Sequence, residues 1–156
     1  MDEIDNFFMK EAYNQALKAQ CINEVPIGCV IVQDNKIIAT GYNERNTKKN
    51  ALYHAELSAI NKACKVVNDW RLEGCTIYVT LEPCPMCAGA ILQARIDRLV
   101  YGAVNPKAGS VSSILNLLDN PSYNHRVAIT QGIMEQKCAF LMSSFFTNLR
   151  KNKPKA

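Results

Sequence analysis

The strongest constraint on the fold is the alternation of helical and strand patterns along the chain. Apolar residues at Ile4, Phe8, Ala12 and Ala16 recur at the spacing of an amphipathic helix. β-Branched runs and further helical patterns then alternate to the end of the chain. In chain order, we predict a helix over the first twenty residues, strands at 28–32 and 36–41, a helix from His54, a strand at 76–80, a helix at 86–94, a strand at 98–101, a short helix at 112–118, a strand at 127–130 and a helix at 134–150.

The order of these elements predicts the architecture. Asp34-Asn35 is a turn signal that joins the first two strands into a hairpin, and the polar stretch 43–50 is expected to be a loop. Strands separated by helices favour parallel neighbours with helices on both faces of the sheet, while the hairpin makes the sheet mixed. We therefore predict an α/β fold, a three-layer α/β/α domain with a central mixed five-stranded sheet.

Length and composition fit one globular domain. The chain has 156 residues, of which 48% are hydrophobic and 21% charged. We assign residues 1–150 to a single domain and 151–156 to a basic tail. The acidic start has the wrong polarity for a signal peptide, and no apolar run approaches membrane-spanning length, so we expect a cytoplasmic protein. In that compartment the seven cysteines are expected to be free thiols or metal ligands.

The net charge of +4 is unevenly distributed. Four cations lie in the last seven residues: Arg150, Lys151, Lys153 and Lys155. Such a tail can meet phosphates, although charge alone favours a solvated terminus.

One group of residues has the composition of a catalytic metal site. Cys84 and Cys87 are three apart at the start of a predicted helix, and His54 begins another. Zinc prefers thiolate and imidazole ligands, and catalytic sites keep three protein ligands so that water can take the fourth position. Glu56 is two residues from His54 and could move protons as a general base and acid.

Two other interpretations of the cysteine pair are less consistent with the sequence. A structural zinc knuckle lacks a fourth ligand, since His125 is the only other histidine. A redox pair would be expected in a thioredoxin-like context, which the prolines on both sides of Cys84 do not provide. The combination of His-x-Glu with Pro-Cys-x-x-Cys therefore favours a deaminase site.

Both motifs resemble the zinc signature of the cytidine deaminase-like superfamily. Outside them the chain is similar to bacterial tRNA-specific adenosine deaminases from about Glu3 to Arg150. The segments that carry this similarity are Val25-Pro26-Ile27-Gly28, Gly41-Tyr42-Asn43, 78–82, Gly102-Ala103, Pro106-Lys107-x-Gly109 and Asn124-His125-Arg126. The resemblance implies a cytidine deaminase-like fold, one zinc per subunit, and a hydrolase that makes inosine from adenosine at the tRNA wobble position, with arginine tRNA as the expected substrate.

The resemblance also implies roles for individual residues. Zinc-bound hydroxide would attack carbon 6 of adenosine while Glu56 carries the proton. The expected substrate-binding residues are Asn43 on the purine, with Ala55 beside it, Val25, Pro26 and Ile27 as an apolar wall, and Asn105, Lys107, Asn124, Arg126, Phe146 and Arg150 toward the RNA. From the residues alone, Asn43 equally suits a turn, and Val25 to Ile27 a strand entrance. Of the adjacent Phe145 and Phe146, one is expected in the core, and we favour Phe146 for RNA.

Asn105 departs from the family pattern, which often has an acidic residue there. We hypothesise that Asn105 keeps a hydrogen bond to the sugar, lowers repulsion from the nucleic acid backbone, and relaxes the preference for RNA over DNA. The family also forms homodimers that share residues between active sites, and the apolar start of the helix after Cys87 suits such an interface.

Two rival functions remain open at this level. A deaminase of free guanine or cytosine would use the same metal chemistry without a basic surface. A noncatalytic zinc-stabilised RNA-binding module would need no Glu56.

Overall fold

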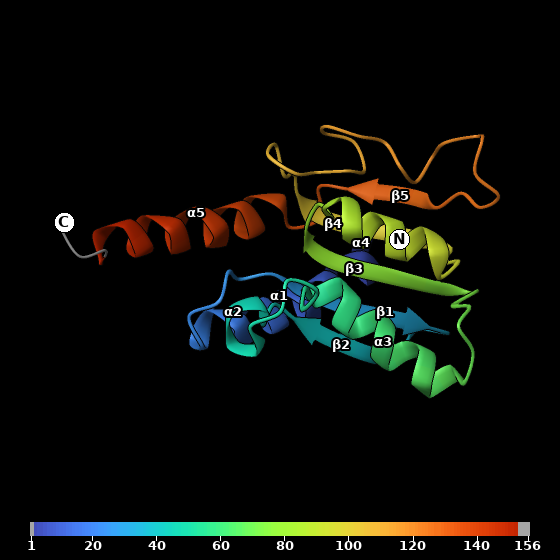
Figure 1. Ribbon diagram of the computed structural model, residues 1–156, viewed down its shortest axis with the longest axis horizontal. Coiled ribbons are helices and arrows are strands. Elements are labelled where there is room, and N and C mark those ends of the chain that lie inside the picture. Colours follow the sequence, from blue (N-terminus) through green and yellow to red (C-terminus); the bar gives the residue numbers. More distant parts are fainter. Residues whose placement is uncertain (1, 153–156) are drawn as a thin grey trace.

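The computed structural model describes residues 2–152, and its elements follow the predicted alternation (Figure 1). The helices are α1 (Asp2–Cys21), α2 (Arg45–Lys48), α3 (Ala55–Val67), α4 (Pro85–Gln93) and α5 (Glu135–Lys151). The strands are β1 (Gly28–Gln33), β2 (Lys36–Tyr42), β3 (Cys75–Leu81), β4 (Arg98–Ala103) and β5 (Ala128–Gln131). The tail cations Lys153 and Lys155 lie outside the described residues. Within residues 2–152 no helix has the length and apolar character needed to cross a bilayer.

The five strands form one sheet in the order β2-β1-β3-β4-β5. β1 is antiparallel to both of its neighbours, whereas β3, β4 and β5 are parallel to one another. Because β1 lies between β2 and β3 and opposes both, β2 and β3 run in the same direction. The predicted mixed five-stranded sheet is confirmed.

Helices cover both faces of the sheet (Figure 1). Alternate residues of β1 separate the two cores: Val30 and Val32 pack with α1 and the start of α5, whereas Cys29 and Ile31 pack with α3 and α4. This alternation is the period of two that a strand buried on both faces requires. The three-layer arrangement is therefore confirmed as well.

The predicted helix at 112–118 is wrong, because those residues, all of them described, form turns and irregular chain. The backbone N–H groups of Val111, Ser112 and Ser113 donate to the buried carboxylate of Glu82 at 3.1, 2.8 and 3.0 Å. Burial alone would raise the pKa of Glu82, but these hydrogen bonds lower it, so the carboxylate is charged. Further along, the N–H groups of Leu115 and Leu117 donate to the carbonyls of Gly109 and Ser110 and not to the residues four positions back, so the chain folds around Glu82 and no helix forms.

The predicted loop at 43–50 contains the short helix α2 instead. Its first turn is held from outside, because the Glu24 carboxylate accepts hydrogen bonds from the N–H groups of Asn46 and Thr47 at 3.2 and 2.6 Å. Free N–H groups at a helix start need such an acceptor. Glu24 lies more than twenty residues away in sequence, so no local pattern reveals it.

A buried ion pair fastens α1 to the sheet. Asp5 accepts hydrogen bonds from the Arg98 guanidinium at 2.8 and 2.7 Å and from the Tyr78 hydroxyl at 2.9 Å. Arg98 also donates to Thr130 on β5 at 2.9 Å. Burial alone would raise the pKa of Asp5, but the hydrogen bonds from Arg98 and Tyr78 and the Arg98 charge outweigh it, and the pKa is lowered.

Replacing Asp5→Asn is expected to reduce the free energy of unfolding by about 3 kcal/mol at pH 7, because Arg98 is left partly buried without its partner. Folding lowers the pKa of Asp5, so its contribution is complete above the usual Asp pKa and is lost as pH falls through the folded-state value. Denaturant unfolding of both proteins from pH 7 to pH 3 should show the difference shrinking. A difference that does not change with pH would contradict this account.

Candidate active site

The metal-ligand residues lie at the N-termini of two helices. His54 directly precedes α3, and Cys84 directly precedes α4, with Pro85 as the first helical residue and Cys87 in the same turn. Both preceding residues are extended, with φ −81° and ψ 155° for His54 and φ −73° and ψ 174° for Cys84. The Cys84 thiol accepts hydrogen bonds from Cys87 in the first turn of α4, and it also faces the His54 imidazole.

The three side chains converge in space. His54 Nδ1 lies 3.6 Å from Cys84 Sγ and 3.5 Å from Cys87 Sγ. Their ligand atoms all lie within 4.8 Å of one another, so the group, here called the ligand cluster, could hold a metal ion. Two thiolates and an imidazole are the donors that zinc prefers, and three ligands leave a coordination position for a reactant.

Close packing at Gly41 fixes the start of α3. A Cβ built on Gly41 would lie 2.3 Å from the Ala55 carbonyl oxygen and 2.9 Å from the Ala59 nitrogen. The helix backbone therefore rests directly on β2, which only glycine allows. This contact determines where His54 and Glu56 lie relative to the sheet.

Shared protons shift the pKa values within the ligand cluster. A hydrogen bond from Cys87 is the main reason that the pKa of the Cys84 thiol falls to about 4, and His54 lowers it further. The pKa of Cys87 is raised by the same hydrogen bond, and that of His54 is raised by its bond with Cys84. Cys84 is therefore a thiolate at neutral pH, the form that binds metals.

Glu56 lies beside the ligand cluster and is 4% exposed. Burial raises the pKa of Glu56 to about 7, and hydrogen bonds from its own backbone N–H and from the Cys87 thiol oppose part of this rise. Glu56 is one residue into α3, on a backbone that Gly41 holds in place. A carboxyl group in such a position is suited to passing a proton to a reactant at the metal.

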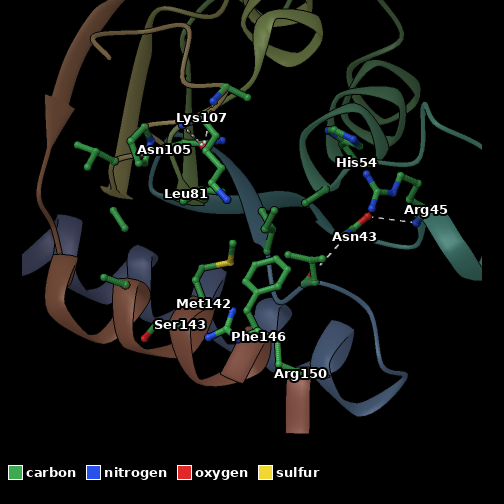
Figure 2. Close-up of a pocket in the computed structure, with 18 residues that line it drawn as sticks. Asn43, Arg45, His54, Leu81, Asn105, Lys107, Met142, Ser143, Phe146 and Arg150 are labelled. Carbon is green, nitrogen blue, oxygen red and sulfur yellow. Dashed lines mark hydrogen bonds between the residues drawn. The ribbon is translucent and has the colours of Figure 1, made fainter. Parts of the chain in front are cut away.

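A cavity of about 670 Å³ opens at the ligand cluster (Figure 2). His54 lines it, whereas Cys84, Cys87 and Glu56 are not among the lining residues within 2–152. His54 is therefore the member of the ligand cluster that faces the cavity, and the Cys84 and Cys87 sulfurs lie 3.6 and 3.5 Å from its Nδ1. The volume is in the range of sites for small molecules and cofactors.

The predicted substrate residues divide into two sets. The set that lines the cavity is Val25, Ile27, Asn43, Ala55, Asn105, Lys107, Phe146 and Arg150. Pro26 is buried between two lining residues but does not itself line the cavity. Asn124 and Arg126 are exposed on the connection between β4 and β5, where Arg126 pairs with Asp119 at 3.7 Å. The described chain does not bring these two residues to the cavity.

Asn43 and Asn105, the predicted asparagines that line the cavity, hold its walls. Asn43 is buried, donates to the Val25 carbonyl at 3.3 Å and accepts from the Arg45 N–H at 3.1 Å. The Asn105 side-chain oxygen accepts from the N–H groups of Lys107 and Ala108 at 3.3 and 3.2 Å. Each side chain therefore has a structural role in addition to any contact with a substrate.

Several lining residues were not predicted from the sequence. On α5, Met142 and Ser143 line the cavity with Phe146, whose ring packs edge-on against that of Phe145. The helical spacing of Phe146 and Arg150 would have identified this face, because positions three and four apart share it. Arg45 also lines the cavity. Its position two residues after the predicted substrate residue Asn43 is the sequence signal that could have identified it.

Comparison with known proteins identifies relatives across nearly the whole chain. A family model described as MafB19-like deaminase matches residues 3–150. The tRNA-specific adenosine deaminase of Bacillus subtilis (strain 168) is 46% identical over 152 residues, 97% of this chain and 94% of that protein. A structure from studies of A-to-I editing by tRNA deaminases at the wobble position of transfer RNA matches with a TM-score of 0.83 at 41% identity, over 86% of this chain and 98% of that chain. Guanine deaminase from Nitrosomonas europaea matches with a TM-score of 0.72 at 17% identity, over 89% of this chain and 82% of that chain, which shows a shared fold alone.

Cys84→Ala and Cys87→Ala are each expected to lower metal affinity by more than about 100-fold. Changing a residue that only orients a metal ligand already lowers the affinity by roughly 10–100-fold. The reason is that each variant removes one of three donors. Metal content per chain, measured by mass spectrometry after dialysis, checks this. Cys21→Ala is the matched control, because Cys21 is exposed at the end of α1. Full metal content in either ligand variant would contradict the assignment.

Proposed function

Because the chain belongs to the family of tRNA-specific adenosine deaminases, we propose that it converts adenosine to inosine at the wobble position of a tRNA anticodon, with arginine tRNA as its substrate. The family resemblance, the cytidine deaminase-like fold and the identification as a hydrolytic deaminase are confirmed. The observation that carries the proposal is that His54 of the ligand cluster lines a cavity with a basic rim, with the buried Glu56 two residues further along α3.

Zinc is the metal that we assign to the ligand cluster, at one ion per subunit. Its preference for thiolate and imidazole fits His54, Cys84 and Cys87, and at neutral pH it would supply an activated water as the nucleophile. Glu56 would take a proton from the attacking water and deliver it to ring nitrogen 1 as the water oxygen bonds to carbon 6. The remaining proton of that oxygen would then pass through Glu56 to the amino group, so that the bond between carbon 6 and this nitrogen breaks and ammonia leaves.

The cavity walls suit a purine base. Val25, Ile27 and Phe146 offer apolar contact and a ring on which a base can stack, with Pro26 supporting the wall from behind. The Asn43 amide keeps a second N–H and a second lone pair beyond its two structural hydrogen bonds, so it can bind the purine edge. Ala55 lines the cavity next to His54 and leaves room for the base.

The rim of the cavity suits an RNA backbone. Arg45, Lys107 and Arg150 reach it from three different segments, and cationic side chains neutralise phosphates. Asn124 and Arg126 remain predicted RNA contacts on a surface outside the cavity. This basic rim favours RNA over a free base, which would need no phosphate contacts.

The proposal includes a homodimer in a cytoplasmic protein. Its support is the segment 109–115, where Ile114 and Leu115 are 57% and 47% exposed. This segment is bonded to the start of α4, because the Ser110 N–H donates to the Pro83 carbonyl at 2.9 Å. Exposed apolar side chains next to an active site are suited to an interface with a second copy.

Glu56→Gln is expected to reduce inosine formation by about 10²–10⁴-fold, because the amide cannot take up or return the proton. Product analysis on an anticodon stem-loop with adenosine at the wobble position measures this, with zinc content and RNA affinity as controls that should not change. Intact inosine formation would support the noncatalytic module. Ammonia release from free guanine or cytosine, with none from the stem-loop, would support the free-base deaminase.

Asn105→Asp is expected to raise the ratio of RNA to DNA deamination, because the added charge increases repulsion from the backbone while a carboxylate oxygen still accepts from a sugar hydroxyl. The substitution also preserves the turn, since a carboxylate can accept the N–H groups of Lys107 and Ala108. Initial rates on matched RNA and DNA hairpins test this. An unchanged ratio would refute the role of Asn105.

A further inference from the structure

Within residues 2–152, two buried glutamates lie outside the catalytic group. Glu24 and Glu82 are each 1% exposed, although carboxylates are rarely buried without extensive hydrogen bonding. Glu24 directly precedes the lining residue Val25, and Glu82 directly follows the lining residue Leu81. Each is adjacent in sequence to the cavity, yet within residues 2–152 neither side chain lines it.

Glu82 holds the segment that follows β4. Its Oε1 accepts from the Asn105 N–H at 3.1 Å and from the Ser113 hydroxyl, and its Oε2 accepts from the three N–H groups of residues 111–113. The chain wraps tightly around the carboxylate, because a Cβ on Gly109 would lie 2.4 Å from Glu82 Cδ. These contacts bracket residues 105–108, which form one wall of the cavity.

Glu24 holds the opposite wall. Its two carboxylate oxygens accept from Asn46 and Thr47 in the first turn of α2, where the residue before the helix, Glu44, makes no side-chain cap among the described residues. That turn carries Arg45, whose N–H is bonded to Asn43. In Figure 2, Asn105 and Lys107 lie on one side of the cavity, and Asn43 and Arg45 lie on the other.

We infer that Glu24 and Glu82 are positioning residues that fix these two walls at the separation required for RNA, an inference that rests on the proposed function. A carboxylate accepts hydrogen bonds and donates none, so it matches a set of converging N–H groups. A glutamine in its place has one oxygen and one NH2 group, and the NH2 group cannot accept from the N–H groups that it faces. The walls then shift, while the ligand cluster and Glu56 stay on the helices and strands that hold them.

The test is Glu24→Gln and Glu82→Gln in the full chain loaded with zinc. Each is expected to raise KM for the wobble stem-loop about tenfold, which corresponds to a loss of about 1.4 kcal/mol of uniform binding. The kcat value and the content of one zinc per chain should not change. Glu44→Gln is the matched control for Glu24→Gln. It removes a carboxylate that directly precedes α2 without capping it, so it should alter KM by no more than about twofold.

Amide hydrogen exchange gives a second measurement that does not depend on RNA. Exchange should accelerate at 105–113 in Glu82→Gln and at 46–47 in Glu24→Gln, with no change at the start of α4. Ser113→Ala, which removes one of the hydrogen bonds to Glu82, should accelerate exchange and raise KM by less than Glu82→Gln does.

The outcomes separate this inference from the proposed function. Loss of zinc or a fall in kcat with unchanged KM would overturn it, since either result means that the carboxylates support the catalytic group. Unchanged exchange and KM would also overturn it. If the natural protein makes no inosine while exchange still responds as expected, the proposed function fails and the structural part of the inference holds. If Glu82→Gln does not fold, Glu82→Asp, with the charge kept and the side chain shorter, should show the same effects.

Discussion

The candidate active site depends on two strands that run in the same direction without touching. β2 and β3 lie on either side of β1 and end at the same edge of the sheet, so the helices that follow them also begin there. Since a ligand residue precedes each helix, His54 and Cys84 meet although thirty residues separate them. The other walls of the cavity come from the same edge, which is where open α/β sheets bind ligands.

Much of this could be predicted from the sequence because the signals are local. The Asp34-Asn35 turn and the β-branched runs on either side determine the hairpin, and the alternation of strands and helices determines the layers. The ligand cluster was also predicted, because the side chains of His54, Cys84 and Cys87 have few other chemical explanations together. Each of these features can be recognised within a short window or from residue type alone.

The remaining features depend on contacts between distant segments. α2 exists where a loop was expected because Glu24 accepts its first N–H groups. Residues 112–118 are not helical because the chain folds around Glu82, and the N–H groups of Leu115 and Leu117 bond to Gly109 and Ser110 in place of the carbonyls four residues back. In both cases a single buried acid overrides local preference. Nothing in one sequence distinguishes such an acid from a solvated one, so the residues that shape the cavity are harder to identify than those that carry the chemistry.

The last helix has a consequence for the size of molecule that the site admits. Of the α5 residues that the structure describes, Cys138 and Leu141 are the buried ones, both near its start, and the rest of the helix extends beyond the sheet (Figure 1). Phe146 and Arg150 therefore line the cavity from a part of the helix that is anchored at one end. Phe146 is 37% exposed and Arg150 is exposed, so this wall stays in contact with solvent, as a nucleotide still joined to a polymer would require.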